Sequence, residues 1–206
     1  MSAAKNKGFY SFRGDANALG GFISAPVRRE IQTLAPVSLP AVGGLTTARI
    51  ESFSLDNLVH CRAAHTVVSG RVETDTTGKI ERLSVLATSV VEGLNILDAI
   101  EAERVVARLS IEIVKKQPLK VSTVGSYFQG LRLAGQHRTE FDHCIDPDGK
   151  ASSGHVVDIP DVGRVILGAL YVTDSFAQLV SIRAELGCPV TGQMTVNCTG
   201  GGGVHD

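Results

Sequence analysis

Apolar and polar residues alternate with a period of two along several segments of the chain. Residues 63–72 and 104–113 show this alternation most clearly. In the second segment the apolar members of one face are Val105, Ala107, Leu109, Ile111 and Ile113. A period of two is typical of a half-buried β-strand, because successive side chains of a strand point to opposite faces of the sheet. The pattern therefore predicts a chain built mainly from strands.

An internal repeat accompanies the alternation. The segment SVVEGLNI at residues 89–96 resembles SYFQGLRL at residues 126–133, with serine, glycine and leucine in the same places and an offset of 37 residues. Weaker copies lie at residues 50–55 and 167–172. The central apolar residues of the four copies are Phe53, Leu94, Leu131 and Leu170, which lie 41, 37 and 39 residues apart. Internal similarity of this kind indicates a repeat-built architecture.

Each copy belongs to a unit that holds at least one pair of strands. Such a unit cannot bury its apolar face alone, so neighbouring units must stack or pair. The sequence predicts one repeat-built antiparallel β domain over residues 1–206, as a β-sandwich, an open barrel or a short β-solenoid. Aromatic residues make up only 5% of the chain, which agrees with thin layers of β-branched side chains. Residues 199–206 are predicted to form a glycine-rich C-terminal tail.

Two segments also have features of short helices. Residues 98–109 contain good helix formers after a candidate N-cap at Asp98, and residues 174–186 end before Gly187, which suits the position after a helix. One or two short helices therefore stay open as an alternative. Strands are favoured because the alternation continues through residues 110–113 without a break.

Four segments occur in an order that is found in a known protein family. They are VSLPAVGG at residues 37–44, SVVEGLNILDAIEAERV at 89–105, GSYFQGLRLAGQ at 125–136 and IPDVGRVILGAL at 159–170. With these segments the chain resembles the choice-of-anchor P family of bacterial surface proteins over about residues 37–186. The resemblance implies an all-β module and transfers no functional residue. We expect this chain to lack the export signal and the C-terminal anchor of that family.

Charge and hydropathy restrict the partners and the location that we expect. The net charge of -1 gives no electrostatic attraction for nucleic acid or for an anionic membrane. Residues 1–20 lack the apolar stretch of a secretory signal, and no run of apolar residues is long enough to predict a transmembrane helix. We therefore expect a cytoplasmic protein. The cell surface or the extracellular space, reached by a non-classical route, is the alternative.

Histidines and cysteines form two weak candidate metal clusters, His60 with His65 and His143 with Cys144. On an unbroken strand, the odd spacing of His60 and His65 sends their side chains to opposite faces. The cysteines also lack the C-x-x-C spacing of zinc sites. We therefore expect separate residues and no bound cofactor.

Two further cysteines are candidates for a disulfide. Cys188 and Cys198 are placed to face each other across a hairpin. Disulfides persist in exported proteins, whereas cytoplasmic proteins keep their thiols reduced. The pair is therefore predicted to be a disulfide in an exported protein and two buried free thiols otherwise.

Motifs for catalysis are missing from the sequence. It contains no G-x-S-x-G nucleophile elbow, no G-x-x-x-x-G-K-[ST] phosphate loop and no G-x-G-x-x-G loop. We therefore expect a protein without enzymatic activity.

Self-association, or another surface contact of a structural module, is the favoured function. A stack of open-edged β units leaves unpaired N–H and C=O groups at its ends, and pairing with another copy removes them. One alternative is a carbohydrate-binding module with a small aromatic face made by Phe9, Tyr10 and Phe12. A second alternative is a metal-assisted hydrolase that uses the two histidine and cysteine clusters.

Overall fold

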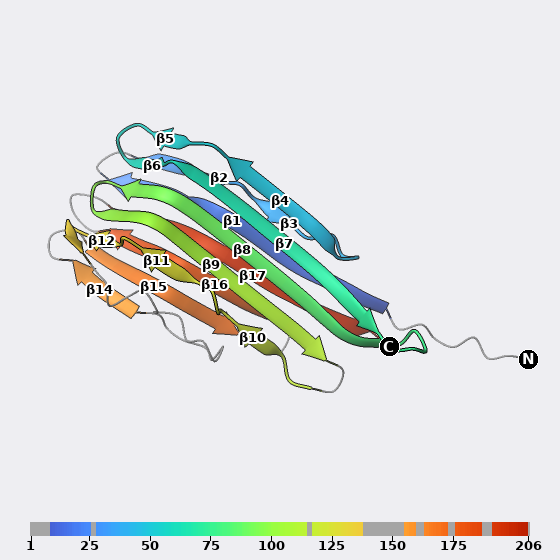
Figure 1. Cartoon of the computed structure of the whole chain (residues 1–206). Helices are drawn as coiled ribbons and strands as arrows, with labels where there is room; N and C mark the ends of the chain where they lie inside the picture. The colour runs from blue at the N-terminus through green and yellow to red at the C-terminus, as the bar shows by residue number, and fades with distance from the viewer. Residues whose placement is uncertain are drawn as a thin grey trace, which may run out of the picture.

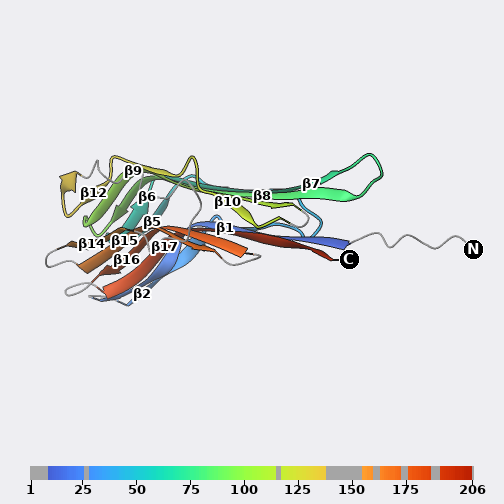
Figure 2. The ribbon, with the colours of Figure 1, turned by 90° about the horizontal axis from the view of Figure 1, so that it is seen from below.

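The protein is an antiparallel β-sandwich. The computed structural model describes residues 9–25, 28–114, 117–137, 155–159, 163–172, 176–186 and 191–205. In these ranges all regular elements are strands, and they form two antiparallel sheets that lie face to face as two layers (Figures 1 and 2). The sheets do not close into a barrel. Of the architectures predicted from the sequence, the sandwich is confirmed.

The smaller sheet has seven strands and carries the first and last described residues. Its order is β14-β15-β16-β17-β1-β2, and β3 also pairs with β1. The strands are β1 (Phe9–Ala25), β2 (Arg29–Leu34), β3 (Val37–Ser38), β14 (His155–Ile159), β15 (Gly163–Val172), β16 (Phe176–Leu186) and β17 (Thr191–His205).

Residues 199–205 do not form the predicted tail, because they belong to the central strand β17. Thr199 pairs with Asp15 of β1 on one side and with Gln178 of β16 on the other. Ladders on both sides hold residues 199–201, and the ladder with β1 continues to His205. Strand pairing thus orders this glycine-rich segment, which local composition alone suggests is a tail.

The larger sheet has ten strands and is a meander extended by short strands. Its long members pair in the order β4 (Gly44–Ile50), β7 (Ala63–Thr74), β8 (Ile80–Ile96) and β9 (Ile100–Val114). Beyond short breaks, β5 (Phe53–Leu55) continues β4, and β6 (Val59–Cys61) leads into β7. The far side of β9 carries β10 (Lys120–Ser122), β11 (Tyr127–Gln129) and β12 (Arg132–Leu133), and β12 pairs in turn with β13 (Gln136–His137).

Both segments with helical features are strands. β9 takes up most of residues 98–109, and Asp98 lies with Leu97 in the preceding tight turn, where both have positive φ values of 53° and 55°. Residues 174–186 lie largely in β16. Pairing on both sides of β9 and β16 overrides the local helix propensity. The described residues contain no helix long and apolar enough to cross a membrane.

Two glycines allow a close approach of the layers. The shared core consists mostly of Val, Ile, Leu and Ala side chains from the inner faces. A Cβ atom on Gly14 would lie 2.8 Å from Cγ1 of Val68, and one on Gly70 would lie 2.7 Å from Cδ2 of Leu39. Since a side chain at either position would overlap with its neighbours in the core, these glycines help to set the spacing of the sheets.

Candidate functional site

A transverse crease crosses the larger sheet. Strand residues normally alternate between the inner and the outer face, but β8 has two consecutive outward residues, Glu92 and Gly93, between the buried Val91 and Leu94. The neighbouring segments also have two consecutive outward residues at this level of the sheet, so that their alternation shifts by one residue. In some segments the two residues lie within a strand, and in others they lie where one strand ends and the next begins. We call the ten outward residues the crease: Glu51 and Ser52, Arg62 and Ala63, Glu92 and Gly93, Glu103 and Arg104, Gln129 and Gly130.

The strand register places these five pairs in one line. Ala63 pairs with Glu92, Glu92 with Arg104, and Arg104 with Gln129. On the other side of β7, Ile50 pairs with Ala64 and Phe53 pairs with Cys61. Glu51 and Ser52, which lie between Ile50 and Phe53, are therefore level with Arg62 and Ala63. The crease therefore runs from one edge of the larger sheet to the other, across the strand direction.

Two glycines with left-handed backbone form part of the crease. Gly93 has a φ of 59° and Gly130 a φ of 62°, and only glycine adopts this region at little cost. A Cβ atom on Gly130 would lie 2.6 Å from Cγ of Glu103, and one on Gly93 would lie 3.0 Å from Cβ of Arg62. Large side chains from the neighbouring strands therefore occupy the space above both glycines.

The crease explains the similarity of residues 89–96 and 126–133. Glu92 and Gln129 both pair with Arg104, from opposite sides of β9. Val91 and Phe128 share Val105 in the same way, and Ile96 and Leu133 share Ile100. The offset of 37 residues thus corresponds to identical register on the two sides of one strand.

The central residues of the sequence copies mark the inner side of the same line. Phe53, Leu94 and Leu131 are each the first inward residue after the crease. Leu170 lies in β15 of the smaller sheet, and its side chain is outside the described residues.

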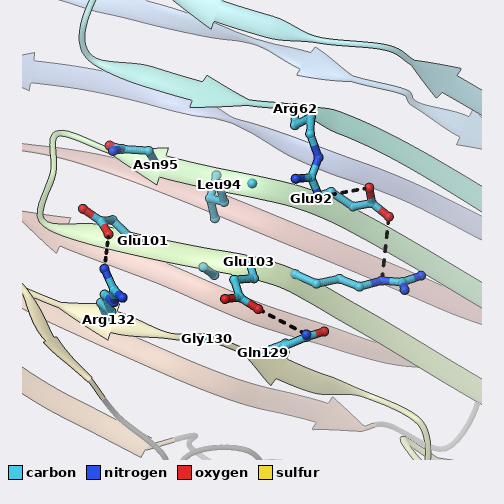
Figure 3. A pocket seen from close by; sticks show the side chains of 12 residues that line it. Arg62, Glu92, Leu94, Asn95, Glu101, Glu103, Gln129, Gly130 and Arg132 are labelled. Atoms are coloured by element: carbon cyan, nitrogen blue, oxygen red, sulfur yellow. Dashed lines mark hydrogen bonds and ion pairs between the residues drawn. The ribbon is translucent and has the colours of Figure 1, made fainter.

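An open groove of about 580 Å³ lies over the middle of the crease (Figure 3). The side chains that define its chemistry are three arginines, three glutamates and two amides. They are Arg62, Arg104 and Arg132, Glu92, Glu101 and Glu103, and Asn95 and Gln129. We call this space the crease groove.

Polar contacts within the crease groove are mostly long. Glu92 lies between Arg62, at 3.5 Å from Nη2, and Arg104, at 4.0 Å from Nε. Arg132 Nη1 is 3.6 Å from Oε2 of Glu101. Charge-assisted hydrogen bonds measure about 2.7–2.9 Å, so these ion pairs use little of the hydrogen-bonding capacity of their groups. The shortest contact is the bond of 3.1 Å that Gln129 Nε2 donates to Glu103.

Arg104 carries an unsatisfied donor. Its Nε atom is buried and has no hydrogen-bond partner, although the ion pair with Glu92 partly neutralises its charge. A buried donor without an acceptor costs free energy.

His65 lies next to the crease on the outer face. It pairs with Arg49 on β4 and with Val90 on β8. Burial lowers the pKa of the imidazole, the positive charges of Arg104 and Arg49 lower it further, and Glu92 acts in the opposite direction. The neutral form of His65 is therefore favoured.

The structure does not join the candidate metal ligands into a site. His60 and His65 both lie on the outer face, not on opposite faces as predicted, because the phase of the alternation changes between them at Arg62 and Ala63. No group of three or more His, Cys, Asp or Glu side chains among the described residues could hold a metal ion. His143 and Cys144 lie outside the described residues.

The cysteines give no test of the predicted disulfide. Cys188 lies outside the described residues, whereas the backbone of Cys198 lies in β17 opposite Ala16 and Leu179. Cys61 is a buried free thiol, and burial raises its pKa. A buried thiol of this kind is unreactive.

The predicted aromatic sugar-binding face is wrong. Phe12 is buried in the core, and Tyr10 packs against the core with its ring edge-to-face with Phe12 at a centroid distance of 5.6 Å. The side chain of Phe9 is outside the described residues. The rings of Tyr10 and Phe12 therefore pack with the core of the sandwich instead of forming an exposed stacking surface.

Sequence reasoning missed the crease groove, although one signal for it was visible. Both strong copies contain an acidic or amide residue followed by glycine and leucine, and this triplet interrupts the alternation at the crease. The remaining groove residues, such as Arg62, Glu101 and Arg132, come from other strands. Only the register of those strands brings them together.

Comparison with known proteins identifies a family without a described function. Residues 9–147 match a family described as a domain of unknown function, DUF8256, and the chain belongs to this family. The match includes the whole crease. No curated protein and no solved structure matches the chain. The resemblance to the choice-of-anchor P proteins stays a prediction.

Proposed function

We propose that this member of the DUF8256 family is a non-enzymatic structural module that associates with a second copy of itself through β4. The observation that carries the proposal is that β4 is an unbroken strand of seven residues and that, among the described strands, it pairs with β7 alone. Its other side offers unpaired N–H and C=O groups, which form a template for another strand.

The two edges of the larger sheet differ in their suitability for pairing. On the far side of β9, the edge is divided among β10 to β13, which have only two or three residues each. Short edge strands prevent pairing between molecules. The opposite edge, at β4, has no such protection.

The residues of β4 favour contact with another copy. The strand has the sequence GLTTARI, without proline and with Arg49 as its single charged residue. Leu45 is 67% exposed, and Val42 just before the strand is 77% exposed. Natural edge strands usually carry charges, prolines or bulges that oppose association, and β4 has little of this defence.

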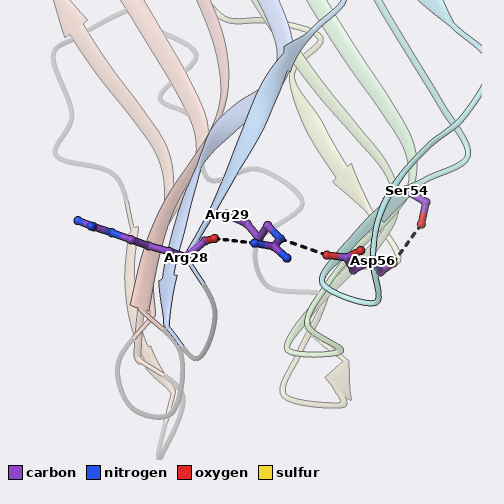
Figure 4. A network of polar contacts seen from close by, with 4 residues as sticks. All are labelled: Arg28, Arg29, Ser54 and Asp56. Carbon is purple, nitrogen blue, oxygen red and sulfur yellow. Dashed lines mark hydrogen bonds and ion pairs between the residues drawn. The ribbon is translucent and has the colours of Figure 1, made fainter.

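Adjacent to β4, a polar bridge covers part of the same side of the sandwich. Arg29 of β2 forms an ion pair of 3.3 Å with Asp56 in the turn between β5 and β6, and Ser54 Oγ donates to the carbonyl of Asp56 (Figure 4). Figure 4 shows the Arg29 side chain reaching from one layer to the other. The bridge ties the β5 end of the edge to the smaller sheet, so β4 is the more accessible segment.

Antiparallel pairing of two β4 strands is compatible with their side chains. A twofold axis at Thr47 places Leu45 opposite the partner's Arg49 and each Thr47 opposite its own copy. No like charges then face each other, and threonine pairs across strands are favourable. Such an isologous contact closes after two copies, and it gives a dimer with one continuous sheet.

The mass in solution tests this proposal. We expect the wild-type protein to form dimers in a concentration-dependent manner in sedimentation or light-scattering experiments. Leu45→Lys places two positive charges near each other across the interface, and Thr47→Pro removes a backbone donor, so both should shift the protein towards the monomer.

A matched control separates edge pairing from general exposure of apolar groups. Val124 is 64% exposed and lies between β10 and β11 on the divided edge, so Val124→Lys should leave the mass unchanged. A wild-type protein that stays monomeric at every concentration would contradict the proposal, and so would a Leu45→Lys variant as dimeric as the wild type.

A further inference from the structure

The crease groove is a site separate from the β4 edge. It lies over β8, β9 and their neighbours, and none of its lining residues belongs to β4. Its volume of about 580 Å³ falls within the range of about 300–1,000 Å³ that is usual for small-molecule sites. The groove is therefore large enough to hold a ligand of a few rings.

The charges of the crease groove balance. Of the described residues, three arginines and three glutamates line it, and their formal charges sum to zero. An anion would meet the carboxylates of Glu92, Glu101 and Glu103, and a cation would meet three guanidinium groups. This composition favours a neutral ligand over either kind of ion.

The groove offers hydrogen-bond donors and acceptors in alternation. Along the crease, Glu92, Arg104 and Gln129 come from neighbouring strands, which lie about 4.8 Å apart, and Arg62 lies between β6 and β7 beside Glu92. The arginines only donate and the glutamates only accept, whereas the amide of Gln129 does both. A ligand that fits this row must itself donate and accept at short intervals.

Hydroxyl groups meet this requirement. A hydroxyl donates one hydrogen bond and accepts two, so a chain of hydroxyls can bond to guanidinium and carboxylate groups in turn. The long ion pairs of 3.5 to 4.0 Å leave those groups with spare capacity. Arg104 also lines the groove, and its side chain is 40% exposed.

A peptide fits less well. Peptides bind β proteins mainly by adding a strand to a free edge or by placing apolar side chains in pockets. The crease groove lies on the face of the sheet, and its apolar lining residues Leu94 and Ala102 are buried on the inner side. The groove thus offers neither a free edge nor an apolar anchor.

We infer that the crease groove binds a neutral polyhydroxyl ligand, a saccharide, along the row from Arg62 to Gln129. The ligand hydroxyls bond to the arginines and glutamates, and the glycines Gly93 and Gly130 leave room for the side chains of Arg62 and Glu103 to lie across the crease. Because none of the described side chains that line the groove is aromatic, the contacts are hydrogen bonds to ring substituents without stacking.

A glycan panel tests this inference on the full chain. The panel contains neutral oligosaccharides of glucose, mannose, galactose and N-acetylglucosamine, with sulfated and uronic-acid oligosaccharides for comparison. We expect a neutral member to bind. Glu92→Gln and Arg62→Gln each remove a charged hydrogen-bond partner from that row and should each weaken that binding about tenfold in calorimetry.

Two controls complete the test. Arg82 lies on the same sheet outside the groove, paired with Glu112 at 2.9 Å, so Arg82→Gln should bind as the wild type does. Leu45→Lys should also keep its affinity, which separates this site from self-association. The inference is overturned if no neutral glycan binds, if only the acidic glycans bind, or if the groove variants keep wild-type affinity.

Discussion

Gly130 combines a left-handed backbone with a crowded environment, so its replacement should cost more than strain alone. Alanine in this conformation costs about 1–2 kcal/mol, and at Gly130 its Cβ atom would also displace Glu103, whose Cγ would be 2.6 Å away. We expect Gly130→Ala to lower the free energy of unfolding in urea by more than this amount.

Gly135 is the matched control for this effect. It has a φ of 74°, but a Cβ atom there would have no neighbour within 4 Å. Gly135→Ala should therefore show the conformational cost without the contact with Glu103. Equal losses of stability in the two variants would mean that the packing over Gly130 contributes nothing.

His65 should make the stability of the protein dependent on pH. Its folded pKa lies below the ordinary value of 6.5, so the unfolded chain binds the proton more readily. Stability is therefore full above 6.5, and it is lost as the pH falls from 6.5 through the folded pKa. We expect wild-type protein to lose more stability between pH 8 and pH 5 than His65→Gln does, as measured by urea unfolding.

A titration of the His65 ring by NMR shows which groups lower its pKa. The facing charged groups are Arg49, Arg104 and Glu92. Arg104→Gln should raise the pKa of His65 without restoring it fully, because burial is the larger cause. A ring that titrates at or above 6.5 in the wild type would refute this account.

Local patterns fail at the crease because the phase of a strand is not a local property. The spacing of His60 and His65 predicts opposite faces only for an unbroken strand, and the two residues share the outer face because Arg62 and Ala63 interrupt the alternation. Nothing in the immediate sequence RA marks that interruption. The interruption depends on the partner strand β8, where Gly93 adopts the left-handed conformation that the shift of alternation requires at little cost in free energy.

Strands were predictable where alternation was long, as in β7 and β9, whose predicted segments match the observed elements closely. Helical features at residues 98–109 and 174–186 misled because helix propensity is weak against pairing on both sides. The glycines of residues 199–203 predicted a tail, but pairing with neighbouring strands makes them part of β17. A central strand is defined by its neighbours, which come from distant parts of the chain.

The offset of 37 residues can be seen in the sequence, but its structural cause can be seen only in the pairing of the strands. Two segments with the same pattern flank β9 in identical register, so the similarity reports equivalent positions beside one strand. The crease groove forms at this place. Its residues could not be grouped from the sequence, since they come from separate strands and meet only across the ladder.

As a whole, the molecule is a thin sandwich whose smaller sheet joins the two ends of the described chain and whose larger sheet carries the crease (Figures 1 and 2). Its larger sheet has one divided edge and one continuous edge at β4. That asymmetry is the physical basis of the proposed dimer, since among the described strands only β4 gives this sheet a continuous edge that can serve as a template.

Hydrogen exchange of the β4 amides at several protein concentrations tests this claim most directly. Unpaired amides of an edge strand exchange readily, whereas amides that bond to a second copy are protected. The account predicts that amides in residues 44–50 become slower to exchange as the concentration rises, while those of β2, an edge strand of the other sheet, do not change. Exchange at β4 that is independent of concentration would contradict it.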